Sequence, residues 1–136
     1  MSAAPARLIV NVDGGSRGNP GPAAIAAVAS EPGGGVLAER SERIGSATNN
    51  VAEYRAMLLG IELARELGAK EVELIGDSQL IVRQVRGEYK VKDPNLKPLR
   101  EKVVKALVDF DSWSIKDVRR ERNEEADRLV NEALDS

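Results

Sequence analysis

The chain has 136 residues, of which 42% are hydrophobic and 31% charged, and it contains neither histidine nor cysteine. This composition is typical of a folded globular protein, and it excludes disulfides, thiolate or imidazole zinc sites and every mechanism that needs a histidine base. Any hydrolytic chemistry must therefore use carboxylates, amides, Lys, Arg or a bound metal ion. The net charge of −2 argues by itself against non-specific affinity for nucleic acid.

The organisation along the chain is simple. We expect a short flexible tail over residues 1–6 and a single domain over residues 7–136, because the sequence shows no repeat and no linker. It also shows no signal-peptide pattern and no run of about 18 apolar residues. These features predict a cytoplasmic protein that does not interact with membranes.

Hydrophobic periodicity predicts five strands and four helices. The expected strands are Arg7–Asp13, Ala23–Ser30, Val36–Ile44, Glu71–Gly76 and Ser112–Val118. The expected helices are Asn50–Leu67, Asp77–Arg86, a helix that opens at Asp93 with an apolar stripe reaching Phe110, and Asn123–Leu134. This order predicts an α/β fold whose mixed sheet combines an antiparallel meander with parallel strands joined by right-handed helical crossovers.

The first expected strand ends in Asp13 and is followed by a glycine-rich stretch, residues 14–22. A buried carboxylate needs a cation or hydrogen-bond donors, and glycines let backbone N–H groups approach a ligand such as a phosphate. The alternative is a strand that ends in an ordinary Asp-Gly turn. The stretch lacks the Gly-Lys-Ser/Thr of a P-loop, which disfavours nucleoside triphosphate hydrolysis.

Three further carboxylates occupy comparable positions. Asp77 directly follows a strand, while Glu53 and Asp127 lie near the starts of helices on their apolar faces. Two of them have a specific structural alternative: Asp77 fits a helix N-cap, and Glu53 fits a capping box with Asn50. If all four converge, their mutual repulsion requires organised cations.

Oxygen ligands without His or Cys favour Mg²⁺ or Mn²⁺. Two such ions, roughly 3.5–4 Å apart, suit in-line displacement at phosphorus without a protein nucleophile. Three amide side chains, Asn19, Asn50 and Gln79, lie near these carboxylates in the sequence. Amides can bind 2′-hydroxyls and minor-groove base edges. Taken singly, each of the three is better explained structurally, as a turn residue, a helix cap and a solvated helix position.

Residues 83–105 carry eight basic side chains against three acidic ones. Such a stretch could follow a phosphate backbone, or it could simply be a solvated face. Lys90 and Lys92 lie in its centre, and we hypothesise that they contact such a backbone.

Four blocks of sequence together resemble type 1 ribonuclease H. They are Asp13-Gly-Gly-Ser-x-Gly-Asn-Pro-Gly-Pro22, Thr48-Asn-Asn-x-x-Glu53, Gly76-Asp-Ser-Gln79 and Arg120-x-x-Asn-x-x-Ala-Asp127. The resemblance extends from about Leu8 to Leu134. It implies the five-stranded ribonuclease H fold with helices on both faces, a monomer, and cleavage of the RNA strand of RNA–DNA hybrids to 5′-phosphate and 3′-hydroxyl ends.

The resemblance also implies roles for individual residues. Asp13, Glu53, Asp77 and Asp127 would be the catalytic set, holding two Mg²⁺ or Mn²⁺ ions when substrate is bound. The backbone of Gly14 and the amides of Asn19, Asn50 and Gln79 would contact the hybrid, and Thr48 would help to hold a phosphate of the DNA strand.

The chain departs from many family members in three respects. One is that Asp93 aligns with the position where many members place an Asn in the phosphate pocket. The chain lacks the histidine of the mobile loop before the last helix, so we hypothesise slow product release, with Arg120 assisting catalysis. It also lacks the basic protrusion with aromatic residues, for which Tyr89–Leu96 is a compact substitute. A junction resolvase or transposase core, or a hybrid-binding module without catalysis, are the alternatives.

Overall fold

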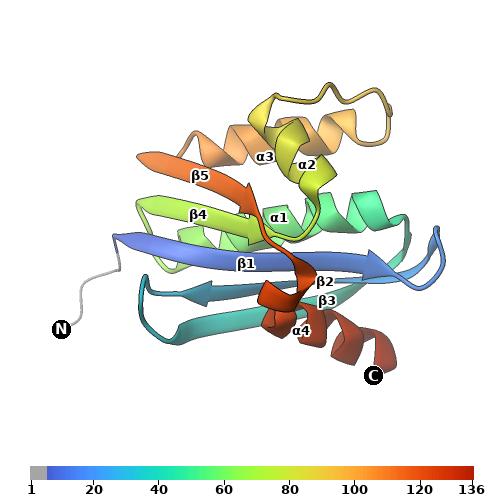
Figure 1. The fold of residues 1–136 in the computed structure, drawn as a ribbon, viewed down its shortest axis with the longest axis horizontal. Coiled ribbons are helices and arrows are strands. Elements are labelled where there is room, and N and C mark those ends of the chain that lie inside the picture. Colours follow the sequence, from blue (N-terminus) through green and yellow to red (C-terminus); the bar gives the residue numbers. More distant parts are fainter. Residues whose placement is uncertain (1–5) are drawn as a thin grey trace.

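The structure, a computed structural model, describes residues 6–136; the expected tail, residues 1–6, lies almost wholly outside this part. A five-stranded sheet forms its centre (Figure 1). Its strands are β1 (Arg7–Ser16), β2 (Gly21–Ser30), β3 (Val36–Ala47), β4 (Glu71–Gly76) and β5 (Ser112–Asp117), in the spatial order β3-β2-β1-β4-β5. The first three strands pair antiparallel, whereas β4 pairs parallel with β1 and β5 parallel with β4. The predicted mixed sheet is confirmed.

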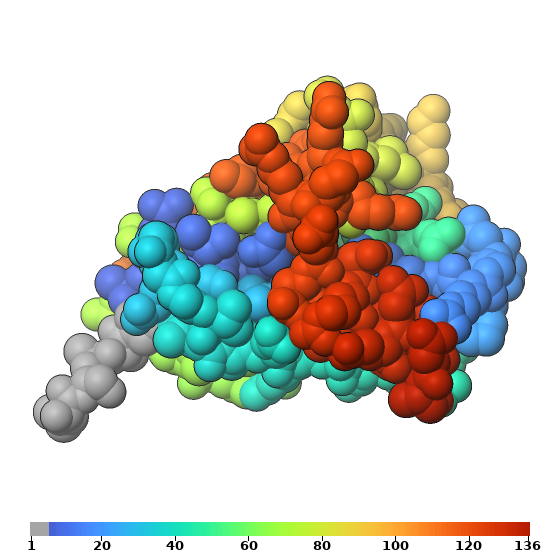
Figure 2. All heavy atoms as spheres, turned by 60° about the horizontal axis from the view of Figure 1, so that its bottom comes forward, coloured from blue at the N-terminus to red at the C-terminus, as the bar shows by residue number. Residues whose placement is uncertain are grey.

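The helices cover both faces of the sheet unequally. They are α1 (Asn49–Glu66), α2 (Gln79–Arg86), α3 (Lys97–Leu107) and α4 (Glu124–Asp135), with a short 3₁₀ turn, η1 (Arg120–Arg122), before α4. The first three helices lie on one side and α4 alone lies on the other (Figure 1). Figure 2 shows α4, in red, lying over the side of the molecule formed by the first strands, with the orange segment before it projecting from the surface.

Two apolar clusters of different size hold these layers together. The larger one joins alternate residues of β1, such as Val10 and Val12, to α1, α2 and α3. α1 packs closely against β1 because Gly60 has no side chain: a Cβ there would lie 2.6 Å from Val12 Cγ1. The smaller cluster attaches α4 to β2 through Ala24, Ala26, Val28, Ala126, Leu129 and Val130.

The structure corrects several predicted boundaries. β2 begins at Gly21 rather than Ala23, and β3 ends at Ala47 rather than Ile44. β1 does not end at Asp13 but continues to Ser16, because its antiparallel pairing with β2 continues to that residue. α1 is capped by Thr48, whose Oγ1 accepts from Val51 N at 3.2 Å, and not by Asn50. α3 begins at Lys97 rather than Asp93, because Asp93 closes a turn by accepting from Asn95 N.

No helix among residues 6–136 is both long and apolar enough to cross a membrane.

Candidate active site

The register of the parallel strands places Asp13 and Asp77 beside each other. Asn11 of β1 is paired with Ile75 of β4, so each aspartate lies two residues beyond the same pair. Neighbouring strands are about 4.8 Å apart, and the carboxyl ends of parallel strands are where sites form in α/β sheets. Asp77 is not the cap of α2, because Ser78 occupies that position and accepts from Ile81 N.

Glu53 reaches the same point from α1. The backbone of α1 approaches β1 so closely at Gly14 that an added Cβ would lie 2.2 Å from the carbonyl oxygen of Ala52. Gly14 N, in turn, donates to Glu53 Oε1 at 3.4 Å. Gly14 therefore has two roles. Its lack of a side chain allows α1 to approach β1 closely, and its backbone N–H binds one oxygen of the Glu53 carboxylate.

Asp13, Glu53 and Asp77 form a compact carboxylate cluster. Each offers an oxygen within 4.8 Å of the oxygens of the other two. Asp13 and Glu53 are only 6% and 7% exposed, and two buried oxygens, Glu53 Oε2 and Asp77 Oδ2, have no hydrogen-bond partner. Buried polar atoms are almost always paired, so these two oxygens are suited to bind a cation.

The electrostatics of the cluster lead to the same conclusion. Burial, followed by the negative charges of Asp77 and Asp127, raises the pKa of Asp13 to about 8. Burial also raises the pKa of Glu53 well above its usual value, and the charges of Asp13 and Asp77 add to this shift. Like charges this close favour the neutral acids unless a cation compensates them.

These residues fit a divalent metal ion. Carboxylate oxygens are the ligands that Mg²⁺ and Mn²⁺ prefer, and the cluster offers two oxygens that nothing else satisfies. The sequence contains no His or Cys that would favour zinc.

Asp127 joins the site from the opposite face of the sheet. It lies in the first turn of α4, half-buried, and is close enough to Asp13 to raise that residue's pKa. It does not belong to the three-residue cluster. Of the four carboxylates that we expected to converge, three form a compact cluster and the fourth, Asp127, lies next to it.

A cavity of about 530 Å³ opens over the carboxylates. Besides the four acidic residues, it is lined by three other residues that the sequence singled out: Gly14, Asn50 and Arg120. Arg120 forms no ion pair in the described part of the chain, so its guanidinium is free to meet a phosphate.

Asn49, which was not predicted from the sequence to be a site residue, links two segments at the edge of this cavity by hydrogen bonds. Its Oδ1 accepts from Ser16 N at 2.9 Å, and its own backbone N donates to Asn19 Oδ1 at 3.0 Å. The pair ties residues 16–19 to the start of α1. Because the Asn19 oxygen is occupied, the free part of that side chain is its NH₂ group, a donor.

The remaining candidates lie outside the cavity lining. Gln79 is exposed at the start of α2, and the Thr48 hydroxyl caps α1. Their proposed contacts with a hybrid stay predictions.

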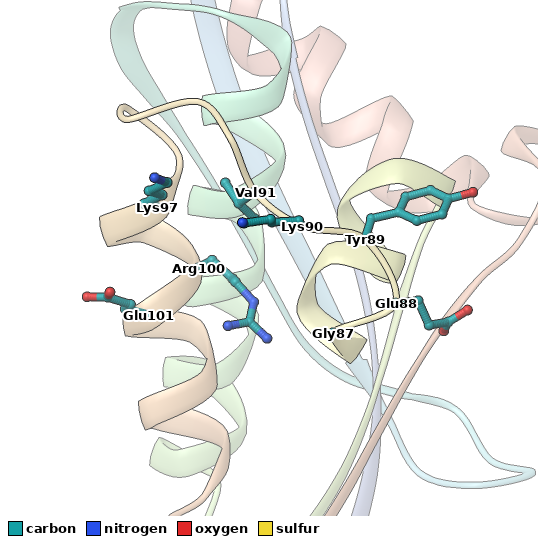
Figure 3. A pocket seen from close by; sticks show the side chains of 8 residues that line it. All are labelled: Gly87, Glu88, Tyr89, Lys90, Val91, Lys97, Arg100 and Glu101. Carbon is teal, nitrogen blue, oxygen red and sulfur yellow. The ribbon is translucent and has the colours of Figure 1, made fainter.

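A second hollow, about 490 Å³, lies between α2 and α3 in the basic stretch. Figure 3 shows Lys90 and Arg100 pointing into the space between these elements, with Lys97 on its rim. Lys92 is exposed but does not line this hollow.

Not all of the predicted basic patch is available to a ligand. Arg86 and Arg100 donate to the carbonyl oxygens of Ile115 and Gln84, and Arg83 lies over the ring of Tyr89. The five lysines of the patch are exposed, and none forms an ion pair within residues 6–136.

Comparison with known proteins finds a matching family model, similar sequences and similar solved structures. The "Reverse transcriptase-like" family model matches residues 11–133. Ribonuclease HI of Halobacterium salinarum is 49% identical over 129 residues, which are 95% of this chain and 65% of that protein. The crystal structure of RNase H1 from this archaeon matches with a TM-score of 0.93 and 47% identity, over 95% of this chain and 98% of that one.

A further solved structure contains nucleic acid. LC11-RNase H1, isolated from compost, has been crystallised in complex with an RNA/DNA hybrid. It matches with a TM-score of 0.89 and 44% identity, over 94% of this chain and 96% of that chain. The chain spans slightly less than two thirds of the Halobacterium protein, and 36% of a Mycobacterium tuberculosis bifunctional protein that is 44% identical to it.

Proposed function

We propose that this chain, which belongs to the type 1 ribonuclease H family, hydrolyses the RNA strand of RNA–DNA hybrids. The observation that carries the proposal is the carboxylate cluster with its two buried, unpaired oxygens at the end of β1 and β4. The hybrid bound by a relative of 44% identity supports the choice of substrate.

Asp13, Glu53 and Asp77 would hold Mg²⁺ or Mn²⁺, with Asp127 completing the set when substrate is bound. The ions, when bound, would activate a water molecule at neutral pH and compensate the charge that develops on the phosphate. The chain's own part is positioning: strand register fixes Asp13 and Asp77, and Gly14 N–H orients Glu53. No protein nucleophile is required, which agrees with the absence of histidine and cysteine.

The reaction adds water across one phosphodiester bond. The water oxygen attacks phosphorus, the bond to the 3′ oxygen breaks, and that oxygen takes a proton. The products are therefore a 5′-phosphate and a 3′-hydroxyl. Arg120, which lines the cavity without an ion-pair partner, would contribute positive charge beside the phosphate.

Substrate recognition is assigned to two regions. The amides of Asn19, Asn50 and Gln79 would contact the minor groove and the 2′-hydroxyls of the hybrid, and Thr48 would help hold a DNA-strand phosphate. Lys90 and Lys92 would hold the DNA strand on the α2–α3 side. A monomeric state and a cytoplasmic location stay predictions from the sequence.

A substrate panel tests this function. The full chain is incubated with an RNA–DNA hybrid, a DNA duplex and a four-way DNA junction, each with Mg²⁺ or Mn²⁺. We expect cleavage of the hybrid alone. Preferred cleavage of the junction would favour a resolvase, and binding of the hybrid without cleavage would favour a non-catalytic module.

A further inference from the structure

The position of Asn123 directly before α4 indicates a helix N-cap, but its side chain makes other hydrogen bonds. It is 2% exposed and makes no side-chain bond to the first turn of α4. Instead its Nδ2 donates to the carbonyl oxygen of Val12 at 2.8 Å, and its Oδ1 accepts from Asn11 Nδ2 at 3.0 Å. Because a carbonyl oxygen can only accept, the Asn123 atom that faces Val12 must be the amide nitrogen.

Both ends of this contact lie next to a carboxylate of the site. Val12 directly precedes Asp13, and the carbonyl oxygen of Asn123 accepts from Asp127 N at 3.1 Å. One side chain therefore joins the strand that carries Asp13 to the helix that carries Asp127. Asn11 extends the contact to β4, because it is paired with Ile75, two residues before Asp77.

The other attachments of α4 are weak or non-directional. Its ion pairs to the sheet, Asp135 with Arg17 and Arg128 with Glu39, are exposed, and exposed ion pairs contribute little to stability. The apolar cluster beneath it has only six buried residues, three of which are alanines. Apolar burial is non-directional, so it holds the helix on the sheet without fixing its place along the strand.

We propose that Asn123 is a positioning residue, which fixes the separation between Asp13 and Asp127 and thereby sets the metal affinity and the turnover of the site. The inference rests on the proposed function, because it assumes that Asp127 acts together with the carboxylate cluster. It assigns to Asn123 no contact with substrate. Polar groups that orient metal ligands in this way commonly change metal affinity or activity roughly 10–100-fold when they are removed.

The test compares Asn123→Ala and Asn123→Leu with the wild type. Neither variant can donate to Val12, and leucine refills most of the volume that alanine leaves empty. Val103→Ala is the matched control, because Val103 is fully buried in α3, on the other face of the sheet, and its truncation lowers stability without touching α4.

Three quantities are measured: the rise in Tm caused by Mn²⁺, the Mn²⁺ concentration for half-maximal cleavage of an RNA–DNA hybrid, and kcat and KM for that hybrid. For both Asn123 variants we expect a smaller Mn²⁺-induced rise in Tm. We also expect a half-maximal concentration raised, and kcat lowered, roughly 10–100-fold, with KM changed less than about twofold, because the groups proposed to bind the hybrid are untouched. Val103→Ala should lower Tm in the absence of metal and leave the metal response, kcat and KM as in the wild type.

The proposal is wrong if the Asn123 variants behave as Val103→Ala does, losing stability while keeping the metal response and kcat. If they do not fold, Asn11→Ala removes one of the two bonds, and an unchanged metal response in that variant would equally overturn the proposal. If the wild type cleaves no hybrid, the proposed function fails, while the Mn²⁺-induced change in Tm still tests the role of Asn123.

Discussion

Replacing Asp13 by asparagine should stabilise the metal-free protein while it abolishes catalysis. The Asp13 side chain is 6% exposed, and burial together with the charges of Asp77 and Asp127 raises its pKa from 3.8 to about 8. At pH 7 the unfolded chain has released this proton and the folded chain mostly retains it. Folding therefore opposes the ionisation of Asp13, and a neutral side chain of the same shape removes that cost.

The size of the effect follows from the shift. Between 3.8 and pH 7 lie roughly three pH units, each worth about 1.4 kcal/mol, which gives at most about 4 kcal/mol. We expect a gain of about 2–4 kcal/mol in the free energy of unfolding, or about 6–15 °C in Tm for a domain of this size.

The pH dependence has a definite sign. Because the folded-state pKa is raised, the stability that Asp13 contributes is complete below 3.8 and is lost progressively as the pH rises towards about 8. The variant does not carry this loss. The difference in stability between Asp13→Asn and the wild type should therefore be near zero below pH 4, reach about 1–2 kcal/mol at pH 5 and increase up to pH 8.

The assay is urea denaturation of both proteins in EDTA, from pH 4 to pH 8. Asp111→Asn, at an exposed carboxylate remote from the site, serves as the control and should show no such trend. Adding Mg²⁺ should stabilise the wild type more than Asp13→Asn. The reasoning is refuted if the variant is no more stable than the wild type at pH 7, or if the difference shrinks as the pH rises.

Three other predictions concern the substrate groove, the close approach of α1 and the rate of turnover. Lys90→Ala combined with Lys92→Ala should weaken hybrid binding and make the slope of log K (the association constant) against log salt concentration shallower by about 1–2. Lys70→Ala, at the far end of β4, is the control and should change neither. An unchanged slope in the double variant would contradict the assignment of these lysines to the DNA strand. Gly14→Ala should cost about 3 kcal/mol or more, because its Cβ would meet the α1 backbone at 2.2 Å, whereas Gly35→Ala, which has open space, should cost little; equal melting temperatures would refute this. Without a histidine loop, the steady-state rate of hybrid cleavage should fall below the single-turnover rate, and equal rates would show that product release does not limit turnover.

The elements and the carboxylates could be predicted from sequence because their determinants are local. Apolar periodicity marks β4 and α1, and the inward position of Glu53 is visible from its neighbours Met57 and Ile61 on the same helix face. Asp13 and Asp77 follow apolar runs that are long enough to be strands. The order of the strands then requires both aspartates to lie at the same edge of the sheet, as the structure shows.

The remaining features depend on partners far away in the chain. Asn123 looks like a helix cap by its position, but its hydrogen-bond partners Asn11 and Val12 precede it by more than a hundred residues. The continuation of β1 to Ser16 depends on pairing with β2, which overrides the turn tendency of two glycines. Arg86 and Arg100 count as free charges in a sequence, whereas both donate to backbone carbonyls in the fold.

One sequence feature could have indicated the role of Asn123. Asn11 is a polar residue inside an otherwise apolar strand, on the same face as Asp13. A half-buried amide in that place needs a polar partner, and the partner had to come from an element that covers this face. Only the fold identifies that element as α4.

Single-turnover cleavage of an end-labelled RNA–DNA hybrid, in Mg²⁺ and with excess enzyme, tests the central claim most directly. The wild type should cut the RNA strand and leave 5′-phosphate and 3′-hydroxyl ends, and Asp13→Asn and Asp77→Asn should each lower the rate by at least about 10³-fold, a loss of about 4 kcal/mol in transition-state stabilisation. Cleavage that persists in either variant, or products with a 3′-phosphate, would contradict hydrolysis at this carboxylate site.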